Sequence, residues 1–160
     1  MKNEVTFTTN SEKETMDFGS FLGERAQDGL FIALTGDLGA GKTHFVQGLA
    51  KGMGIEGVVG SPTFTIMNIY DEDGRLPLKH FDFYRLHSED DLWNIGWEEY
   101  GEGGVVVVEW ADMFPSLIPE ESIHIHIVLS GEEERKITVS WSGKAPVEIT
   151  KEIENYAAGH

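Results

Sequence analysis

The residues from Gly36 to Thr43 have the types and spacing needed to hold phosphate groups. They are Gly36, Asp37, Leu38, Gly39, Ala40, Gly41, Lys42 and Thr43, and they match the pattern G-x-x-x-x-G-K-[ST] without a mismatch. Glycines leave room for the backbone to wrap phosphate oxygens. The lysine adds positive charge near the β- and γ-phosphates, and the threonine hydroxyl can bind Mg²⁺. The sequence therefore predicts a nucleotide held by these residues.

The segments on either side of this loop predict the elements that would position it. The apolar run 30–33 has the character of a strand buried on both faces. Residues 42–54 indicate a helix, because Phe45, Leu49 and Met53 recur at a spacing near four. A strand, a tight turn and a helix together aim the first N–H groups of the helix at an anion. The alternative, a glycine-rich turn that binds nothing, is disfavoured by this flanking pattern.

Two acidic residues follow strand-like segments and could complete a site for Mg²⁺ and water. Glu109 ends the valine run 105–108, and Asp82 lies in the aromatic segment 80–85. Open α/β sheets place ligands at the carboxyl ends of their strands. One carboxylate would bind Mg²⁺ and the other would orient or deprotonate the attacking water, and spacing does not assign the two roles. The alternatives are a surface acid for Glu109 and, for Asp82, a water-facing strand face shared with His80.

The whole pattern predicts a three-layer α/β fold with a central, mainly parallel sheet. The phosphate loop is expected at the carboxyl end of the first strand, with antiparallel hairpins toward one edge. A helix is expected over 10–29, since Ser11 can cap it, Glu14 follows three residues on and Gly29 stops it. The other expected elements are a hairpin of strand-like arms at 63–70 and 75–86 with a turn at 71–74, helical turns over 88–101, a strand at 104–110 and a hairpin of 122–130 and 135–141.

Length and composition limit the number of domains, the kind of binding partner and the cellular compartment. The 160 residues, 40% of them hydrophobic, predict one domain over 1–160, in which 142–160 form a short helix or a loosely attached, frayed tail. The net charge of −16 repels nucleic-acid phosphates, so any nucleic acid would be reached through a partner protein, although an acidic surface also serves solubility. The absence of cysteine excludes disulfides and thiolate metal sites. Without a signal-like segment or a membrane span, a cytoplasmic protein is expected.

Four segments in this order, GDLGAGKT, SPTFT, HFDFYRL and VEWAD, resemble the TsaE family over about Thr9 to Arg135. The resemblance implies a bacterial P-loop ATPase of tRNA threonylcarbamoyladenosine (t6A) biosynthesis that requires ATP and Mg²⁺. It implies TsaD and TsaB as partners, with TsaD and TsaB performing the transfer to tRNA and this subunit hydrolysing ATP to reset their complex. Contact with tRNA would then be indirect.

The same resemblance implies roles for individual residues. Thr43 and Glu109 would hold Mg²⁺, with Asp82 essential for hydrolysis and Lys42 on the phosphates. Thr63 of the switch-like SPTFT segment would lie near the γ-phosphate. Trp110, which follows the metal carboxylate in the motif, would shape the site or a partner surface. The adenine would lie between the start of the chain, around Asn10 and Glu12, and the late Arg135.

Three rival interpretations compete with the ATPase. GTP is disfavoured because the chain has no N-K-x-D. A small-molecule P-loop kinase usually closes an arginine-bearing lid over its donor, and no two arginines lie near each other in this sequence. A nucleotide-gated binding module that hardly hydrolyses would use the same residues, so only turnover would separate it. Arg85 is the internal candidate for an arginine aimed at the transition state, with a structural ion pair as its alternative.

Other conspicuous residues are assigned structural roles. His124 and His126 fall on one strand face, but two ligands without a third make a poor zinc site. His44 is expected to be a helix residue rather than a catalytic base. The aromatic residues Trp93, Trp97 and Tyr100 are expected to pack in the core, with a partner surface as the alternative.

Overall fold

The structure, a computed structural model, describes residues 3–36, 41–55, 67–70, 76–83, 88 and 104–159. The elements along these residues are β1 (Asn3–Thr9), α1 (Glu12–Arg25), β2 (Phe31–Gly36), α2 (Lys42–Gly52), β3 (Met67–Tyr70), β4 (Leu78–Asp82), β5 (Val105–Glu109), the short 3-10 helices η2 (Ala111–Met113) and η3 (Pro115–Leu117), β6 (Ile123–Leu129), β7 (Arg135–Trp141) and α5 (Val147–Ala158).

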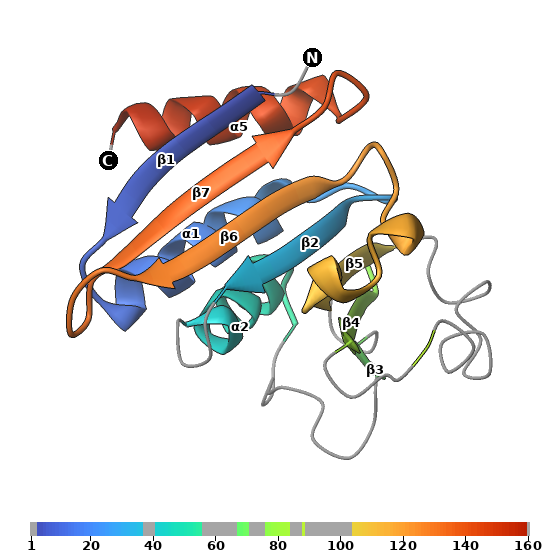
Figure 1. Cartoon of the computed structure of the whole chain (residues 1–160), viewed down its shortest axis with the longest axis horizontal. Helices are drawn as coiled ribbons and strands as arrows, with labels where there is room; N and C mark the ends of the chain where they lie inside the picture. Colours follow the sequence, from blue (N-terminus) through green and yellow to red (C-terminus); the bar gives the residue numbers. More distant parts are fainter. Residues whose placement is uncertain are drawn as a thin grey trace.

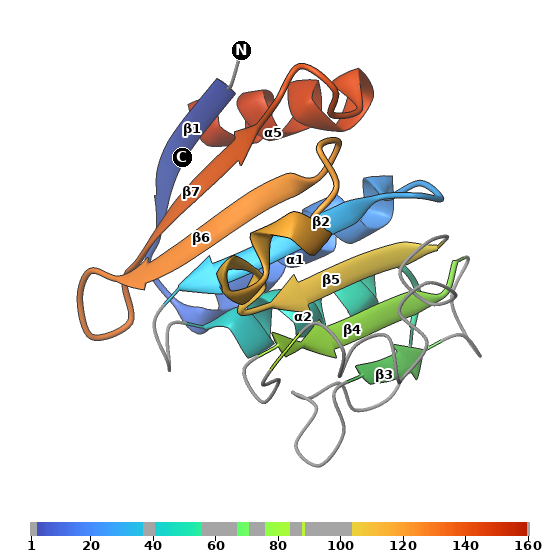
Figure 2. The same cartoon turned by 45° about the vertical axis from the view of Figure 1, so that its right-hand side comes forward.

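In the described part of the chain, seven strands form one sheet in the order β1-β7-β6-β2-β5-β4-β3 (Figure 2). The strands β6, β2, β5 and β4 run parallel to one another at its centre. Antiparallel strands flank this centre on both sides, β7 and β1 beyond β6 and β3 beyond β4. The predicted α/β fold with a mainly parallel centre is confirmed, but the antiparallel strands occupy both edges instead of one.

The first strand of the chain is β1, which the sequence analysis did not anticipate. Only Val5 and Phe7 mark its buried side, and the other residues are polar, so its alternation is short and easily overlooked. It pairs with β7 along its whole length, from Asn3 opposite Trp141 to Thr9 opposite Arg135. The phosphate loop therefore follows the second strand, β2, and not the first.

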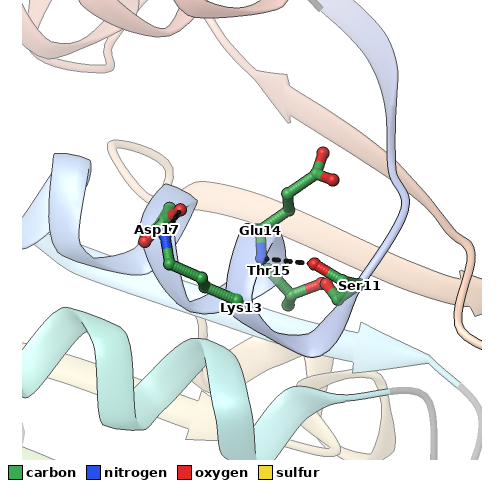
Figure 3. Close-up of polar contacts among 5 residues, drawn as sticks. All are labelled: Ser11, Lys13, Glu14, Thr15 and Asp17. Carbon is green, nitrogen blue, oxygen red and sulfur yellow. Dashed lines mark hydrogen bonds and ion pairs between the residues drawn. The ribbon is translucent and has the colours of Figure 1, made fainter.

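Helices α1 and α2 lie together on one face of the sheet, and η2 and η3, drawn in gold, lie on the other (Figure 1). The start of α1 is capped as predicted: the Ser11 hydroxyl accepts a hydrogen bond from the Glu14 backbone N–H at 3.1 Å (Figure 3). The helix ends at Arg25, earlier than predicted, since the Ala26 N–H bonds back to the Gly23 carbonyl. Gly29, at φ +96°, instead turns the chain into β2.

Glycines bring the backbones of α1 and α2 into direct contact. A Cβ on Gly19 would lie 2.2 Å from the Phe45 carbonyl oxygen, and a Cβ on Gly48 would lie 2.0 Å from the Met16 carbonyl oxygen. The same holds for Gly23 and Gly52, so each helix presents two glycines four residues apart on one face. Helix α1 thereby supports the helix that begins at Lys42.

Two groups of buried apolar residues hold the sheet between these layers. The group on the helix side includes Phe18, Leu22, Ile32, Leu34, Phe45, Leu49, Val105 and Val107. The group on the opposite side includes Phe31, Ala33, Phe81, Phe83, Val106 and Val108. Because successive strand residues point to opposite faces, β2 and β5 are buried on both sides, as the sequence predicts.

The segment after Trp141 forms the helix α5, one of the two forms that the sequence left open. Ile149 and Ile153 are buried in the helix-side core. The ring of Tyr156 packs against Phe7, Phe18 and Phe21, at centroid distances of 5.4, 5.1 and 4.7 Å. Among the described residues, no helix combines the length and apolar character needed to cross a bilayer.

Several predicted segments lie outside the described residues. They are the first part of the strand-like arm at 63–66, the turn between the arms at 71–74, both ends of the second arm at 75 and 84–86, the predicted helical turns at 89–101 and the loop residues 37–40. The described parts of the two arms, β3 and β4, form the predicted antiparallel pair.

Candidate active site

The strand β2 and the helix α2 place both ends of the predicted phosphate loop. Gly36 ends β2 with φ +139°, and a Cβ there would lie 2.0 Å from the Ile127 carbonyl oxygen on β6. Gly41 precedes α2 in the left-handed region, at φ 99° and ψ 16°. Side chains are strained in both conformations, so the two positions require glycine. The residues between them, Asp37, Leu38, Gly39 and Ala40, lie outside the described residues.

Lys42 is held at the loop although its side chain is buried, with 6% of the residue exposed. Its Nζ donates a hydrogen bond to the Gly36 carbonyl oxygen at 2.9 Å and lies 4.1 Å from the centre of the Trp110 ring. Trp110 adopts a left-handed conformation, with φ 59° and ψ 36°, that brings its ring to the lysine. Such a conformation is costly for a bulky residue and is found most often at functional sites.

The N-terminus of α2 is arranged to accept an anion. It has no side-chain cap and no acidic residue in its first turn, and its first residue is the cation Lys42. A positive side chain at this end opposes the helix dipole, so a bound anion would stabilise both. Thr43, the second residue of the helix, is half-buried beside the same end.

The carboxylates of Asp82 and Glu109 occupy neighbouring positions at the carboxyl ends of β4 and β5. The two residues are partners in the parallel register, so their side chains leave the sheet on the same face. That face also carries Leu34, Val107 and the start of α2. Glu109 is buried, with 4% of the residue exposed, and Asp82 is half-buried. Neither Asp82 nor Glu109 is therefore the exposed surface residue that the alternative interpretation of the sequence would require.

His80 joins this group, and its burial excludes the water-facing face that the sequence left open. It has no exposed surface, and its Nε2 lies 2.5 Å from the Glu109 Oε2. The signal for this contact was available, because His80 precedes Asp82 by two residues and must share its strand face. The alternating sequence alone does not say whether that face is buried.

The predicted adenine residues lie around the other side of the loop. Thr9, next to Asn10, is the register partner of Arg135, whose Nε lies 3.9 Å from an ideal Cβ on Gly41. Glu12 forms a 3.5 Å contact between its Oε2 and the Nε2 of His44, in the first turn of α2. Residues from distant parts of the chain therefore meet beside Gly41 and the first turn of α2, as the resemblance implies, and His44 is a helix residue as expected.

Other predicted residues lie on the face of the sheet opposite α2 or are not described. His124 and His126 lie exposed on β6, where the His126 Nδ1 bonds the Thr35 hydroxyl at 2.7 Å. Among the described residues, no group of three or more His, Cys, Asp or Glu side chains could hold a metal ion by itself. The candidates outside the described residues are Thr63, Arg85, Trp93, Trp97 and Tyr100.

A separate groove of about 460 Å³ lies between the end of α1 and the start of α5. Its lining includes Glu24, Asp28, Glu148 and Glu152. These carboxylates would repel a nucleotide, and the groove lies at the amino end of β2, away from Lys42. It is therefore not the phosphate site.

Comparison with known proteins identifies the family. Residues 9–137 match the family described as "Threonylcarbamoyl adenosine biosynthesis protein TsaE". The chain belongs to the TsaE family. The "tRNA threonylcarbamoyladenosine biosynthesis protein TsaE" of Bacillus subtilis is 39% identical to it over 154 residues, which cover 96% of each chain. The TsaE protein of Treponema pallidum, which carries the same name, is 41% identical over 134 residues, covering 82% of this chain and 97% of its own.

A solved structure agrees with the fold. The crystal structure of Bacillus subtilis YdiB aligns with a TM-score of 0.82 and 35% sequence identity, over 98% of this chain and 97% of the other. The predicted resemblance to the TsaE family and the predicted fold are therefore confirmed. The roles of the individual site residues stay predictions.

Proposed function

We propose that this protein is a Mg²⁺-dependent ATPase that serves the t6A modification of tRNA by acting on a complex of TsaB and TsaD. The observation that carries the proposal is the buried Lys42 at the uncapped start of α2, behind a loop bounded by two glycines with positive φ. That arrangement suits a polyphosphate better than any neutral ligand. The names of the relatives supply the biosynthetic setting.

Lys42 and the helix N-terminus bind the phosphates in this proposal. The Lys42 ammonium exchanges its hydrogen bond with the Gly36 carbonyl for phosphate oxygens. Trp110 keeps the ammonium at the mouth of the loop by its cation–π contact, so the charge is already in place when the nucleotide arrives. The backbone N–H groups of the first turn of α2 complete the anion site.

The donor set at this site fits Mg²⁺ and does not fit a metal bound by protein side chains alone. Thr43 offers a hydroxyl and Glu109 a buried carboxylate, and Mg²⁺ in nucleotide sites takes one or two such oxygens together with phosphates and waters. When bound, Mg²⁺ would neutralise charge on the phosphate oxygens. Thr43 and Glu109 are therefore the residues proposed to hold it.

Asp82 is proposed to handle the water. It is the register neighbour of Glu109, and a carboxylate in that position can orient a water molecule and accept its proton. The reaction is the attack of water on the γ-phosphate of ATP, which yields ADP and phosphate. Thr63 is proposed to lie near the γ-phosphate. The adenine is assigned to Asn10, Glu12 and Arg135, and the meeting of β1, β7 and Gly41 supports this assignment.

Dependence on partners follows from the shortage of cations. The chain has four arginines, Arg25, Arg75, Arg85 and Arg135. Arg25 is paired with Glu152 far from Lys42, and Arg135 bonds the Glu134 carbonyl at the adenine side. An arginine aimed at the transferred phosphoryl group speeds such reactions by about 10³-fold or more. Unless Arg85 supplies that charge, turnover by the isolated chain should be slow, and the TsaB–TsaD complex would complete the site.

The net charge of −16 supports an indirect relation to tRNA. A reconstituted reaction tests the proposed role in t6A formation: TsaB, TsaD, tRNA and the threonylcarbamoyl donor are combined with wild-type protein or with Lys42→Ala. We expect repeated rounds of t6A formation only with the wild type and ATP. Lys51→Ala, which removes an exposed lysine from the same helix, is the matched control and should behave as wild type. Formation of t6A that continues equally without this chain would contradict the proposal.

A further inference from the structure

The buried pair of His80 and Glu109 has a geometry that sequence motifs do not explain. His80 lies on β4 and Glu109 ends β5, and their Nε2 and Oε2 atoms are 2.5 Å apart. Both residues are almost fully buried, with 0% and 4% of their surface exposed. A hydrogen bond to a carboxylate at this depth is strong, since few water molecules compete for either group.

The two ring nitrogens of His80 are in different situations. A carboxylate only accepts hydrogen bonds, so Nε2 must be the donor and its N–H points to the Glu109 oxygen. Among the described residues, the buried Nδ1 has no hydrogen-bond partner. The contact therefore fixes which ring nitrogen faces Glu109 and carries the hydrogen of this bond, namely Nε2. The imidazole ring therefore donates a single hydrogen bond, from Nε2, to the Glu109 carboxylate.

Packing alone does not call for a histidine at this position. Neighbours of His80 on the same face are Leu78, two residues earlier, and two valines of β5, Val105 and the register partner Val107. An apolar residue would fill this space without burying an unpaired nitrogen. A buried polar pair in which one atom finds no partner within the described part of the chain is costly, and such costs persist mainly where a specific geometry is needed.

We propose that His80 is a positioning residue that fixes the Glu109 carboxylate in the orientation from which it holds Mg²⁺. The inference rests on the proposed function, because it assigns Mg²⁺ to Glu109. A flexible glutamate side chain has several rotamers, and the hydrogen bond from Nε2 selects one of them before metal and nucleotide arrive. Partners of this kind behind a metal ligand are commonly worth about 10- to 100-fold in metal affinity.

Three substitutions separate positioning from packing. His80→Gln keeps an N–H donor at about the distance of Nε2, His80→Asn keeps an amide that is too short to reach Glu109, and His80→Leu fills the space without a donor. The measurement is the Kd of a fluorescent ADP analogue, once in EDTA and once in saturating Mg²⁺. Because Mg²⁺ binds free nucleotide equally in every sample, differences among variants report the contacts that the protein makes to the metal. Thermal unfolding of each variant is recorded alongside.

The expected result is a split between the two conditions. In EDTA all variants should bind the analogue like wild type, whereas in Mg²⁺ His80→Leu and His80→Asn should bind roughly 10- to 100-fold more weakly and His80→Gln within about threefold of wild type. If His80→Leu does not fold, the comparison of Asn with Gln decides. Equal Mg²⁺-dependent affinity in all folded variants overturns the positioning role. Wild-type protein that binds the analogue equally with and without Mg²⁺ overturns the proposed metal site itself, and with it this inference.

Discussion

Asp82 and Glu109 stand side by side at the carboxyl ends of two parallel strands, as partners in the register of β4 and β5. Adjacent strands lie about 4.8 Å apart, so the two carboxylates leave the sheet within reach of one small group. His80 on β4 donates a hydrogen bond to the Glu109 carboxylate, and Lys42 lies at the start of α2 on the same face of the sheet. In our proposal the buried, hydrogen-bonded Glu109 holds the metal and the half-buried Asp82 handles the water, which are the two roles that sequence spacing left open.

The adenine assignment predicts a selective effect at Arg135. Arg135→Ala should weaken ATP binding about tenfold, because the guanidinium beside Gly41 can contact the base and ribose. The rate at saturating ATP should change little, because Arg135 is assigned to the adenine end of the nucleotide and away from the reacting phosphate. Steady-state kinetics measure both quantities, with Lys136→Ala, an exposed neighbouring cation, as the control. An unchanged KM for Arg135→Ala would remove this residue from the nucleotide site.

The contact between α1 and α2 predicts an unusual response to alanine. An alanine in a helix normally stabilises it by about 1 kcal/mol relative to glycine. At Gly48 the added methyl group would meet the Met16 carbonyl at 2.0 Å, so Gly48→Ala should lower the free energy of unfolding by about 1–3 kcal/mol. Gly143 has no atom within 4 Å of an added Cβ, so Gly143→Ala should change stability by less than about 0.5 kcal/mol. Urea denaturation compares the two, and equal stabilities would mean that the helices are not in close contact.

The left-handed backbone of Trp110 predicts that glycine is better tolerated there than alanine. Both substitutions remove the ring and its contact with Lys42, so they differ only in the backbone. At φ 59°, Trp110→Gly should be more stable than Trp110→Ala by about 1 kcal/mol, because a Cβ is strained in this region. Paired denaturation curves measure the difference. A more stable alanine variant would show that the residue does not hold this conformation in solution.

Tyr156 predicts a pH dependence at the alkaline end. Burial raises the pKa of Tyr156 above its ordinary value of 10.0, and the charges of Asp17 and Glu14 raise it further. Above about pH 10 the unfolded chain therefore loses this proton first, so the free energy of unfolding falls as pH rises through the folded pKa. Below that pH both states keep the proton and the full contribution is present. The stability of wild type minus that of Tyr156→Phe should be constant up to about pH 9 and then decline, whereas parallel profiles would contradict the shift.

The strongest parts of the sequence prediction came from motifs with a local cause. The loop context, the valine strand before Glu109 and the cap at Ser11 depend on neighbouring residues and are found in the structure. Strand β1 was missed because its stability comes from pairing with β7, more than 120 residues away in the sequence. The close approach of α1 and α2 was missed for a similar reason: a glycine that ends a helix and a glycine that faces another helix look alike in sequence.

The contrast between local motifs and long-range pairing also explains which parts of the site the sequence predicts. Lys42 and Thr43 follow from one continuous motif, whereas the meeting of Glu12, Arg135 and Gly41 depends on how β1 and β7 pair across the sheet. The role of His80 required its burial, which alternation along a strand does not reveal.

The most direct test of the central claim is ATP turnover measured with and without Mg²⁺, and with and without a TsaB–TsaD complex. Wild type is compared with Asp82→Asn, Glu109→Gln and the control Glu133→Gln, whose carboxylate is exposed in the turn between β6 and β7. We predict slow, Mg²⁺-dependent turnover that rises when the complex is added. Asp82→Asn and Glu109→Gln should each lower the turnover rate by about 100-fold or more, whereas Glu133→Gln should not change it. Turnover that is independent of Mg²⁺, or that survives in both site variants, would contradict the account and favour a nucleotide-gated binding protein.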